Sequence, residues 1–259
     1  MIITCKIIDY GNVRKKFIYF ILILFLLNSV SPAGGEDGKT LLQEGDLYYK
    51  QNRLNLAEET YEKALNIYLQ NKDTEGLSLA YFKLGDSYRK LENLEKAEEQ
   101  YKEVLKRSPE NQEAHLGLGH IYRKKGDISK AIEEYKKAPG EAAAHNNLGS
   151  LYGNQGNMDE AIKEFKKAEE IEPEDYRTCI NLGSAYYHQK NWDKSIEYYS
   201  KAIEKEPEEG EAYYYLGLTY KKKELYDKAI ENFEHFIEIA PDSPQVQDAV
   251  MQLEEINKF

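Results

Sequence analysis

Residues 182–207 read LGSAYYHQKNWDKSIEYYSKAIEKEP, and four features of this stretch recur along the chain. A Leu-Gly pair is followed by a tyrosine three residues after the glycine, a small residue twelve after it and an aromatic residue sixteen after it. Counted from Gly183, these are Tyr186, Ser195 and Tyr199. The pattern begins again at Gly85, Gly119, Gly149 and Gly217 and, with a changed first position, at Gly45. Six copies in register predict a repeat protein.

The recurring residue types have a direct packing interpretation. Small residues at the glycine and alanine positions let two helices approach closely, and the aromatic side chains fill the space between neighbouring units. Because proline cannot continue a helix, it ends the second helix of four units, at Pro109, Pro173, Pro207 and Pro241. Ten of the 22 tyrosines occupy the two aromatic positions, so core packing explains much of the tyrosine excess.

The pattern resembles the tetratricopeptide repeat, whose unit is a helix–turn–helix of about 34 residues. This resemblance implies an all-α fold, a right-handed α-solenoid of six units over residues 41–243. The approximate unit bounds are 38–77, 78–111, 112–141, 142–175, 176–209 and 210–243. A capping helix is expected over 244–259, because Val246, Ala249, Val250 and Leu253 form one apolar face, with Ser243 as N-cap and Pro244 at the first position. The total is thirteen helices.

Two units depart from the 34-residue spacing. The first is six residues longer, which predicts a longer second helix or a longer loop. The third is four residues shorter and carries Pro139-Gly140 directly after Ala138, so its second helix should stop early. Either the stack absorbs this deletion, as solenoids do, or the short unit is a hinge between units one to three and units four to six.

Residues 1–33 have the composition of an export signal. Arg14, Lys15 and Lys16 precede an apolar run over 17–27, and the small residues Ser31 and Ala33 stand where cleavage requires them. The run is shorter than a membrane span; an uncleaved inner-membrane anchor is the alternative, and a start near Val13 would make the signal more compact. A linker over 34–40 follows. We therefore expect an exported bacterial protein, periplasmic or secreted, that meets a membrane only if the signal is uncleaved.

Composition and motifs exclude several classes of function. With 46 acidic and 35 basic residues, the net charge of −11 argues against nucleic acid as a partner. Zinc-protease, P-loop and serine-hydrolase motifs are absent from the sequence, and two cysteines cannot make a disulfide scaffold. The chain is predicted to be no enzyme and to need no cofactor or metal. His115, His145 and Cys179 share one helix-packing position, which favours packing roles; metal ligation by the histidines is the alternative.

The resemblance also implies a concave groove, lined by the first helix of each unit, that binds a protein or peptide partner. The favoured groove positions, in units four to six, are Asn146, Asn147, Ser150, Asn154, Arg177, Asn181, Ser184, Tyr187, His188, Tyr214, Leu218 and Lys221. Secondary positions, in units two and three, are Phe82, Asp86, Arg89, Leu116, His120 and Arg123. The same carry-over gives Leu42, Asp46, Tyr49, Lys83, Lys124 and Tyr215.

Two groove features bear on the partner. Asn147 and Asn181 precede Leu-Gly, as in family members whose asparagines hold a peptide backbone, although they could equally be ordinary polar residues on a solvated face. The first helices also tend to end in lysine or arginine, as at 123–125 and 221–223. This either complements the helix dipole or makes a basic stripe for an acidic peptide. The family's carboxylate clamp for chaperone tails is not met.

The sequence therefore predicts a non-enzymatic scaffold or assembly factor that binds a protein or peptide outside the cytoplasm. The alternative is a membrane-anchored or self-associating structural component of the cell envelope that binds no extended peptide.

Overall fold

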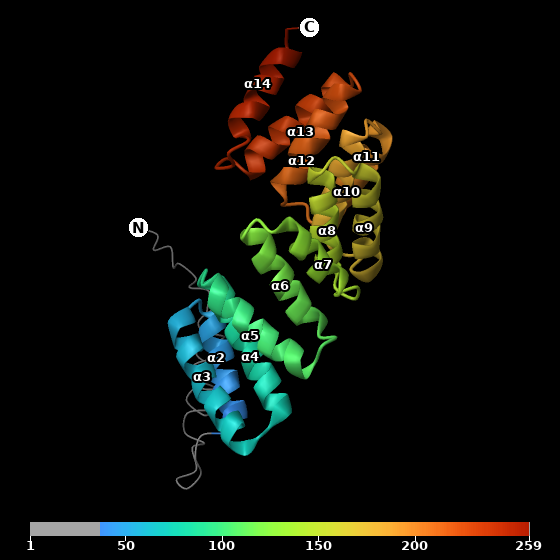
Figure 1. Ribbon diagram of the computed structural model, residues 1–259. Coiled ribbons are helices and arrows are strands. Elements are labelled where there is room, and N and C mark those ends of the chain that lie inside the picture. The colour runs from blue at the N-terminus through green and yellow to red at the C-terminus, as the bar shows by residue number, and fades with distance from the viewer. Residues whose placement is uncertain (1–36, 259) are drawn as a thin grey trace, which may run out of the picture.

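The computed structural model describes residues 37–258, and this part of the chain folds into thirteen α-helices without a strand (Figure 1). The predicted all-α class and the predicted number of helices are confirmed; the predicted signal over 1–33 lies outside the described residues. The helices are α2 (Gly38–Lys50), α3 (Leu54–Asn71), α4 (Thr74–Lys90), α5 (Leu94–Arg107), α6 (Gln112–Lys124), α7 (Ile128–Lys136), α8 (Ala142–Asn154), α9 (Met158–Ile171), α10 (Tyr176–His188), α11 (Trp192–Lys205), α12 (Gly210–Lys222), α13 (Tyr226–Ile239) and α14 (Val246–Ile256).

The helices pack in consecutive pairs, α2 with α3 through α12 with α13. Close approach inside a pair depends on glycine: a Cβ placed at Gly149 would lie 2.5 Å from the ring of Phe165. Most first helices start at a side-chain cap. In units two and three, Asp73 and Asn111 accept hydrogen bonds from backbone N–H groups at 2.9 and 2.8 Å. The closeness of Gly149 and Phe165 shows that the Leu-Gly position of a unit packs directly against the aromatic position of the same unit.

The six pairs stack into a curved array that runs from the blue end to the red end of Figure 1. The first helices of neighbouring units contact one another along the whole array, from α2 with α4 to α10 with α12. Comparable contacts between the second helices of neighbouring units do not occur within residues 37–258. The first helices therefore lie on the inner side of the curve, and their exposed side chains line its concave face.

Both irregular units are built from changes in helix length. The extra residues of unit one lengthen helices, because α3 has 18 residues and α4 has 17, whereas α11 has 14 and α12 has 13. The second pair consequently begins at Thr74, before the expected unit boundary at 78. Helix α7 has only 9 residues and ends before Pro139, so the predicted early stop is confirmed.

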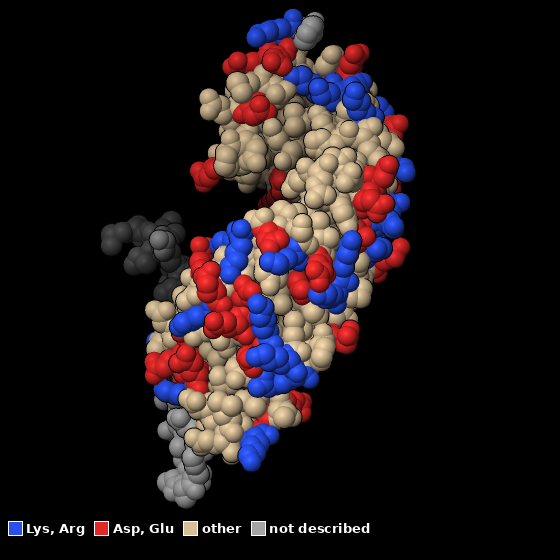
Figure 2. Space-filling model, in the orientation of Figure 1, with Lys and Arg blue, Asp and Glu red and all other residues tan. Residues whose placement is uncertain are grey.

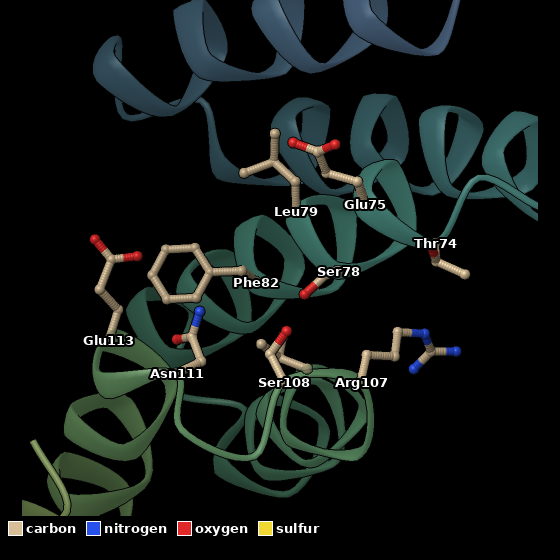
Figure 3. Close-up of a pocket in the computed structure, with 10 residues that line it drawn as sticks. Thr74, Glu75, Ser78, Leu79, Phe82, Arg107, Ser108, Asn111 and Glu113 are labelled. Carbon is tan, nitrogen blue, oxygen red and sulfur yellow. The ribbon is translucent and has the colours of Figure 1, made fainter.

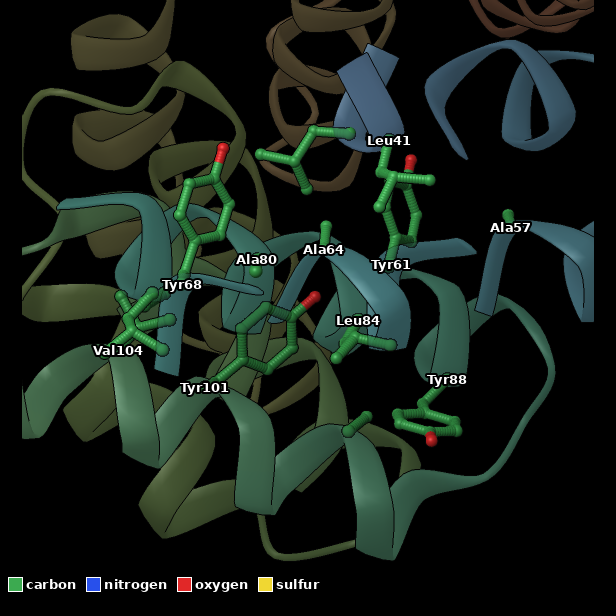
Figure 4. Close-up of a cluster of buried hydrophobic side chains, with 14 of the residues drawn as sticks. Leu41, Ala57, Tyr61, Ala64, Tyr68, Ala80, Leu84, Tyr88, Tyr101 and Val104 are labelled. Carbon is green, nitrogen blue, oxygen red and sulfur yellow. The ribbon is translucent and has the colours of Figure 1, made fainter. Parts of the chain in front are cut away.

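Aromatic rings from the second helices form the centre of the core. Tyr61, Tyr101, Tyr135, Tyr199 and Phe233 are at most 1% exposed. Figure 4 shows the cluster of the first two units, where tyrosine rings lie among small residues such as Ala64 and Ala80. Core packing therefore accounts for the tyrosines at this position.

The two ends of the array differ from expectation. Helix α2 begins at Gly38, because the Asp37 side chain caps it, so the expected linker over 34–40 is shorter. Helix α14 begins at Val246, two residues after Pro244, and its N-cap position is held by Gln245. The Ser243 hydroxyl donates to the Gln245 side chain at 2.5 Å and does not cap the helix.

The apolar face of α14 is narrower than the sequence pattern suggested. Ala249 and Ile256 are buried against the last pair, but Val250 is 40% exposed. Among the described helices, α14 contacts only α13 and α12. No further unit covers its other side within the described chain, so Val250 on that side stays exposed.

Candidate functional site

Hydroxyl groups of buried tyrosines reach the concave face. In each case the partner is the residue that follows the glycine of the Leu-Gly position. The pairs are Tyr61 Oη with Asp46 Oδ1 at 2.6 Å, Tyr101 Oη with Asp86 Oδ1 at 2.7 Å and Tyr135 Oη with His120 Nδ1 at 3.2 Å. These bonds fix the side chains that line the groove of the first three units.

The concave face of units one to three carries charges that pair with one another. Lys83 Nζ lies 2.9 Å from Asp46, and the Arg89 guanidinium lies 3.1 Å from Asp86. Beside them, burial and the nearby guanidinium groups lower the pKa of His120 to about 4, so its ring is neutral at physiological pH. This part of the groove is charged but internally compensated.

The basic ends of the first helices are also compensated. Lys124 Nζ lies 2.6 Å from Glu92, and Lys125 Nζ lies 2.8 Å from Glu98, while Lys223 is paired with Asp193. Figure 2 shows acidic and basic side chains interleaved over the lower units. Of the six basic residues at 123–125 and 221–223, Lys124, Lys125, Lys221 and Lys223 thus have acidic partners, which disfavours the alternative of a basic stripe for an acidic peptide.

Units four and five carry an uncharged polar network instead. Asn146 Nδ2 donates to Thr178 Oγ1 at 2.8 Å, and Asn181 Nδ2 donates to Asn146 Oδ1 at 3.3 Å. Asn147 Nδ2 donates to the carbonyl of Ala143 at 2.7 Å. An amide nitrogen carries two hydrogens and an amide oxygen two lone pairs. Asn147 and Asn181, both half-buried, therefore keep donor and acceptor capacity toward a peptide.

A cavity of about 310 Å³ opens beside this network, between α8, α9 and α10. We call it the unit 4–5 cavity. Its lining consists of Gly149, Ser150, Gly153, Asn154, Met158, Ala161, Phe165, Asn181, Ser184, Ala185 and His188. The structure thus brings together five of the predicted groove residues: Ser150, Asn154, Asn181, Ser184 and His188.

Two favoured residues of unit six are engaged by the capping helix. Tyr214 is 8% exposed and donates from its hydroxyl to Asp248 Oδ2 at 2.6 Å. Lys221 Nζ donates to the side chains of Gln252 and Glu255, each at 2.5 Å. The physical reason is that α14 occupies the place that the first helix of a seventh unit would take. Neither side chain is available to a partner while α14 is docked.

The other predicted groove residues are dispersed. Arg177 is exposed, and its Nε forms an ion pair with Asp175 Oδ1 at 2.8 Å at the start of α10. The Tyr187 ring packs edge-on against Trp192 at a centroid distance of 5.1 Å. Leu42 is buried and cannot line a groove. The half-buried positions are Leu116, Leu218, Tyr49 and Tyr215, and Arg123 is exposed at the end of α6.

A second cavity, of about 460 Å³, lies at the start of α4 and is drawn in Figure 3. Of the predicted residues only Phe82 lines it. Ser78, Leu79 and Glu113 were missed because they lie near the start of their helices, before the groove positions that the resemblance supplies, and Thr74 and Glu75 because they lie in the extra turn of α4. The 40-residue spacing between Gly45 and Gly85 was the one signal that pointed to this extra turn.

Sequence models of the tetratricopeptide repeat match residues 37–110, 82–142, 142–175, 176–209 and 198–231. Together they cover residues 37–231, and the matches over 142–175 and 176–209 coincide with the pairs α8–α9 and α10–α11. The chain belongs to the tetratricopeptide-repeat family. Because this repeat is a protein-interaction fold, the chain has a protein-interaction role.

Solved tetratricopeptide-repeat structures share the fold. MamA is 32% identical, with a TM-score of 0.56, over 63% of this chain and 92% of MamA. The type IV pilus biogenesis factor PilW is 18% identical, with a TM-score of 0.70, over 82% of this chain and 98% of PilW. YrrB, described as having an unusual peptide-binding site, is 22% identical, with a TM-score of 0.59, over 75% of this chain and 99% of YrrB. No curated protein matches the chain.

Two buried histidines of this tetratricopeptide-repeat array are held at both ring nitrogens. The contacts are His115 Nδ1 with Glu134 at 2.6 Å and Nε2 with the Pro109 carbonyl at 2.8 Å, and His145 Nδ1 with Glu164 at 2.6 Å and Nε2 with the Pro139 carbonyl at 3.1 Å. Their hydrogen bonds give them structural roles, as packing had predicted. No cluster of three or more potential metal ligands occurs among the described residues.

The remaining features of the repeat array concern reactivity and membranes. Cys179 is buried, and burial raises the pKa of its thiol, which disfavours the reactive thiolate. Over residues 37–258, the helices lack the combination of length and apolar character needed to cross a bilayer.

Proposed function

We propose that this tetratricopeptide-repeat protein is a non-enzymatic scaffold or assembly factor that acts outside the cytoplasm. It binds an extended segment of a partner protein along the concave face of units four and five. The observation that carries this proposal is the hydrogen-bonded network of the uncharged side chains Asn146, Thr178 and Asn181 beside the unit 4–5 cavity, which ends at the Asp175 carboxylate. The signal composition of residues 1–33 supports export. PilW, a pilus biogenesis factor, is built on the same fold.

The network favours binding because it holds its own side chains in place. Asn181 is oriented by Asn146, and Asn146 by Thr178, whose hydroxyl donates to Asp175 at 3.0 Å. Preorganised amides lose little conformational freedom when a peptide binds. Each can donate to a peptide carbonyl and accept from a peptide N–H, so the contact reads the backbone of an extended segment and not its charge.

The test is a pull-down from the native cell envelope with the double variant Asn147→Ala plus Asn181→Ala. We expect partner recovery to fall at least about tenfold, the equivalent of about 1.4 kcal/mol. The matched control is Asn232→Ala plus Asn55→Ala, of which Asn55 is exposed in the first turn of α3, a second helix outside the groove. Asn232 also donates to the carbonyl four residues earlier, at 2.8 Å, but it lies on α13, outside the groove. Equal recovery by the two double variants would remove the groove proposal.

The second candidate is an anchored or self-associating component of the cell envelope. The apolar run over 17–27 favours it, because an uncleaved segment would tether the array to a membrane. Fractionation separates the two candidates. A released, processed chain supports the adaptor, whereas an unprocessed chain retained in the membrane supports the anchored component.

A further inference from the structure

One glycine on the concave face stands where every other unit has a large side chain. Gly153 lies four residues after Gly149 of the Leu-Gly pair. The equivalent residues in the other five units are Tyr49, Arg89, Arg123, Tyr187 and Lys221. The difference removes side-chain volume from the groove at a single point along the array.

The fold does not require glycine at this position. A Cβ at Gly153 would meet Ala161 Cβ at 3.8 Å and Met158 Cε at 4.0 Å, which are ordinary van der Waals contacts. Positive φ at the end of α8 is taken by Gly156 and not by Gly153. Neither packing nor backbone geometry therefore requires glycine at position 153. Glycine is also less favourable than alanine inside a helix, so its presence has a cost in stability.

The consequence of the missing side chain is the unit 4–5 cavity. Gly153 leaves space that is lined by the apolar side chains of Phe165 and Met158 together with the amide side chains of Asn154 and Asn181. Its volume of about 310 Å³ is at the lower end of the roughly 300–1,000 Å³ typical of ligand pockets. The opening therefore suits one bulky side chain better than a cofactor.

The lining also selects against charge. No Asp, Glu, Lys or Arg is among the residues that line the unit 4–5 cavity. A charged group that entered it would lose water without gaining an opposite charge, whereas an aromatic or aliphatic side chain would bury apolar surface against Phe165 and Met158. The amide of Asn181 in the lining and that of Asn147 outside it remain for the backbone on either side of the inserted residue.

We propose that Gly153 is a specificity-determining residue that opens a side-chain pocket in the groove. The occupant is an extended segment of a partner protein that inserts one uncharged aromatic or large aliphatic residue, while Asn147 and Asn181 hold its backbone. This inference rests on the proposed groove-binding function and adds the class of residue that the groove selects.

The probes are fluorescein-labelled nonapeptides of Ser, Thr and Gln with Phe, Leu, Ala, Glu or Lys at the centre, titrated against the full chain by fluorescence anisotropy. We expect the Phe and Leu peptides to bind at least about tenfold more tightly than the other three, which is the range set by one apolar group in a pocket. Gly153→Leu should remove that preference by filling the cavity. Gly153→Ala, which adds only a methyl group, should keep it within about threefold. Circular dichroism and thermal unfolding verify that both variants fold.

The outcomes separate the two proposals. If Gly153→Leu leaves the Phe and Leu preference intact, or the wild-type chain shows no preference, the pocket assignment is overturned. If the Asn147→Ala plus Asn181→Ala variant still recovers the partner in full, the proposed function itself fails. If Gly153→Leu instead changes the sedimentation of the chain at rising concentration, the occupant is a second copy of the chain, which also overturns the proposal.

Discussion

The Tyr101 hydroxyl donates a 2.7 Å hydrogen bond to the Asp86 carboxylate and so connects the core of unit two to its concave face. The ring is fully buried, whereas Asp86 also pairs with Arg89 on the groove. In unit four the equivalent ring is Phe165, which packs without a hydroxyl. The same aromatic position can therefore serve the core alone or both the core and the groove.

Removing this hydroxyl should destabilise the array without disturbing the core. Tyr101→Phe leaves the ring in place, as Phe165 does naturally, but loses a hydrogen bond to a charged acceptor. We expect the free energy of unfolding to fall by about 1–2 kcal/mol in urea titrations. Tyr135→Phe is the control, because the partner of Tyr135 is the neutral His120. A larger loss for Tyr135→Phe than for Tyr101→Phe would contradict the assignment.

Acid should weaken the contact between units two and three through Glu98. Partial burial acts to raise the pKa of this carboxyl, but hydrogen bonds from Lys102, Lys125 and Tyr122 outweigh it and lower the pKa to about 2. Since the folded pKa lies below the ordinary value, the stabilisation is present above about pH 4.5 and is lost as the pH falls toward 2. Solvent screening limits it to about 1 kcal/mol.

The measurement is the free energy of unfolding from pH 7 to pH 2. At pH 7 the free energy of unfolding of Glu98→Gln should be lower than that of the wild-type chain. Below pH 4.5 it should fall less steeply with pH than the wild-type value does. Glu59→Gln serves as control, because Glu59 pairs with Lys63 within one exposed helix face. An identical decline for Glu98→Gln and the wild-type chain would exclude Glu98 as the acid-sensitive group.

His145 should contribute through its two hydrogen bonds more than through its volume. His145→Leu keeps an apolar filler but leaves the buried Glu164 carboxylate and the Pro139 carbonyl without this partner. We expect a loss of about 2–3 kcal/mol in urea unfolding. The double variant His145→Leu plus Glu164→Leu should recover part of it, because the buried carboxylate, which Lys167 alone would then pair at 2.9 Å, is removed as well. Strict additivity of the two substitutions would show that the residues do not interact.

The capping helix should depend on Tyr214. Asp248→Ala removes the acceptor of the Tyr214 hydroxyl, and we expect the melting temperature to fall by about 2–4 °C together with faster proteolysis within α14. Asp242→Ala, in the exposed loop before α14, should change neither. Tyr214→Phe should leave partner binding unchanged, since the hydroxyl bonds to Asp248 of α14. A loss of binding would show that the Tyr214 hydroxyl contacts the partner.

The repeat architecture was predictable because it depends on local spacing. Leu-Gly and the aromatic residue sixteen positions after its glycine must meet in a helix pair, as Gly149 and Phe165 do. The early end of α7 followed from Pro139, which cannot continue a helix. The extension of unit one could be a helix or a loop by pattern; the structure makes it helix on both sides of Lys72, whose φ of 54° turns the chain between α3 and α4.

The site was less predictable, because a groove position carried over from the repeat frame does not say what its side chain already touches. Asn147 and Asn181 keep capacity for a partner, whereas Tyr214 and Lys221 are held by a helix more than thirty positions away. Short-range periodicity in the chain was enough to establish which helices exist and, except at α14, where Val250 is exposed, which face packs. Which of the concave side chains are free, and where a cavity opens, was decided by packing between units, since those contacts join residues that no local spacing relates.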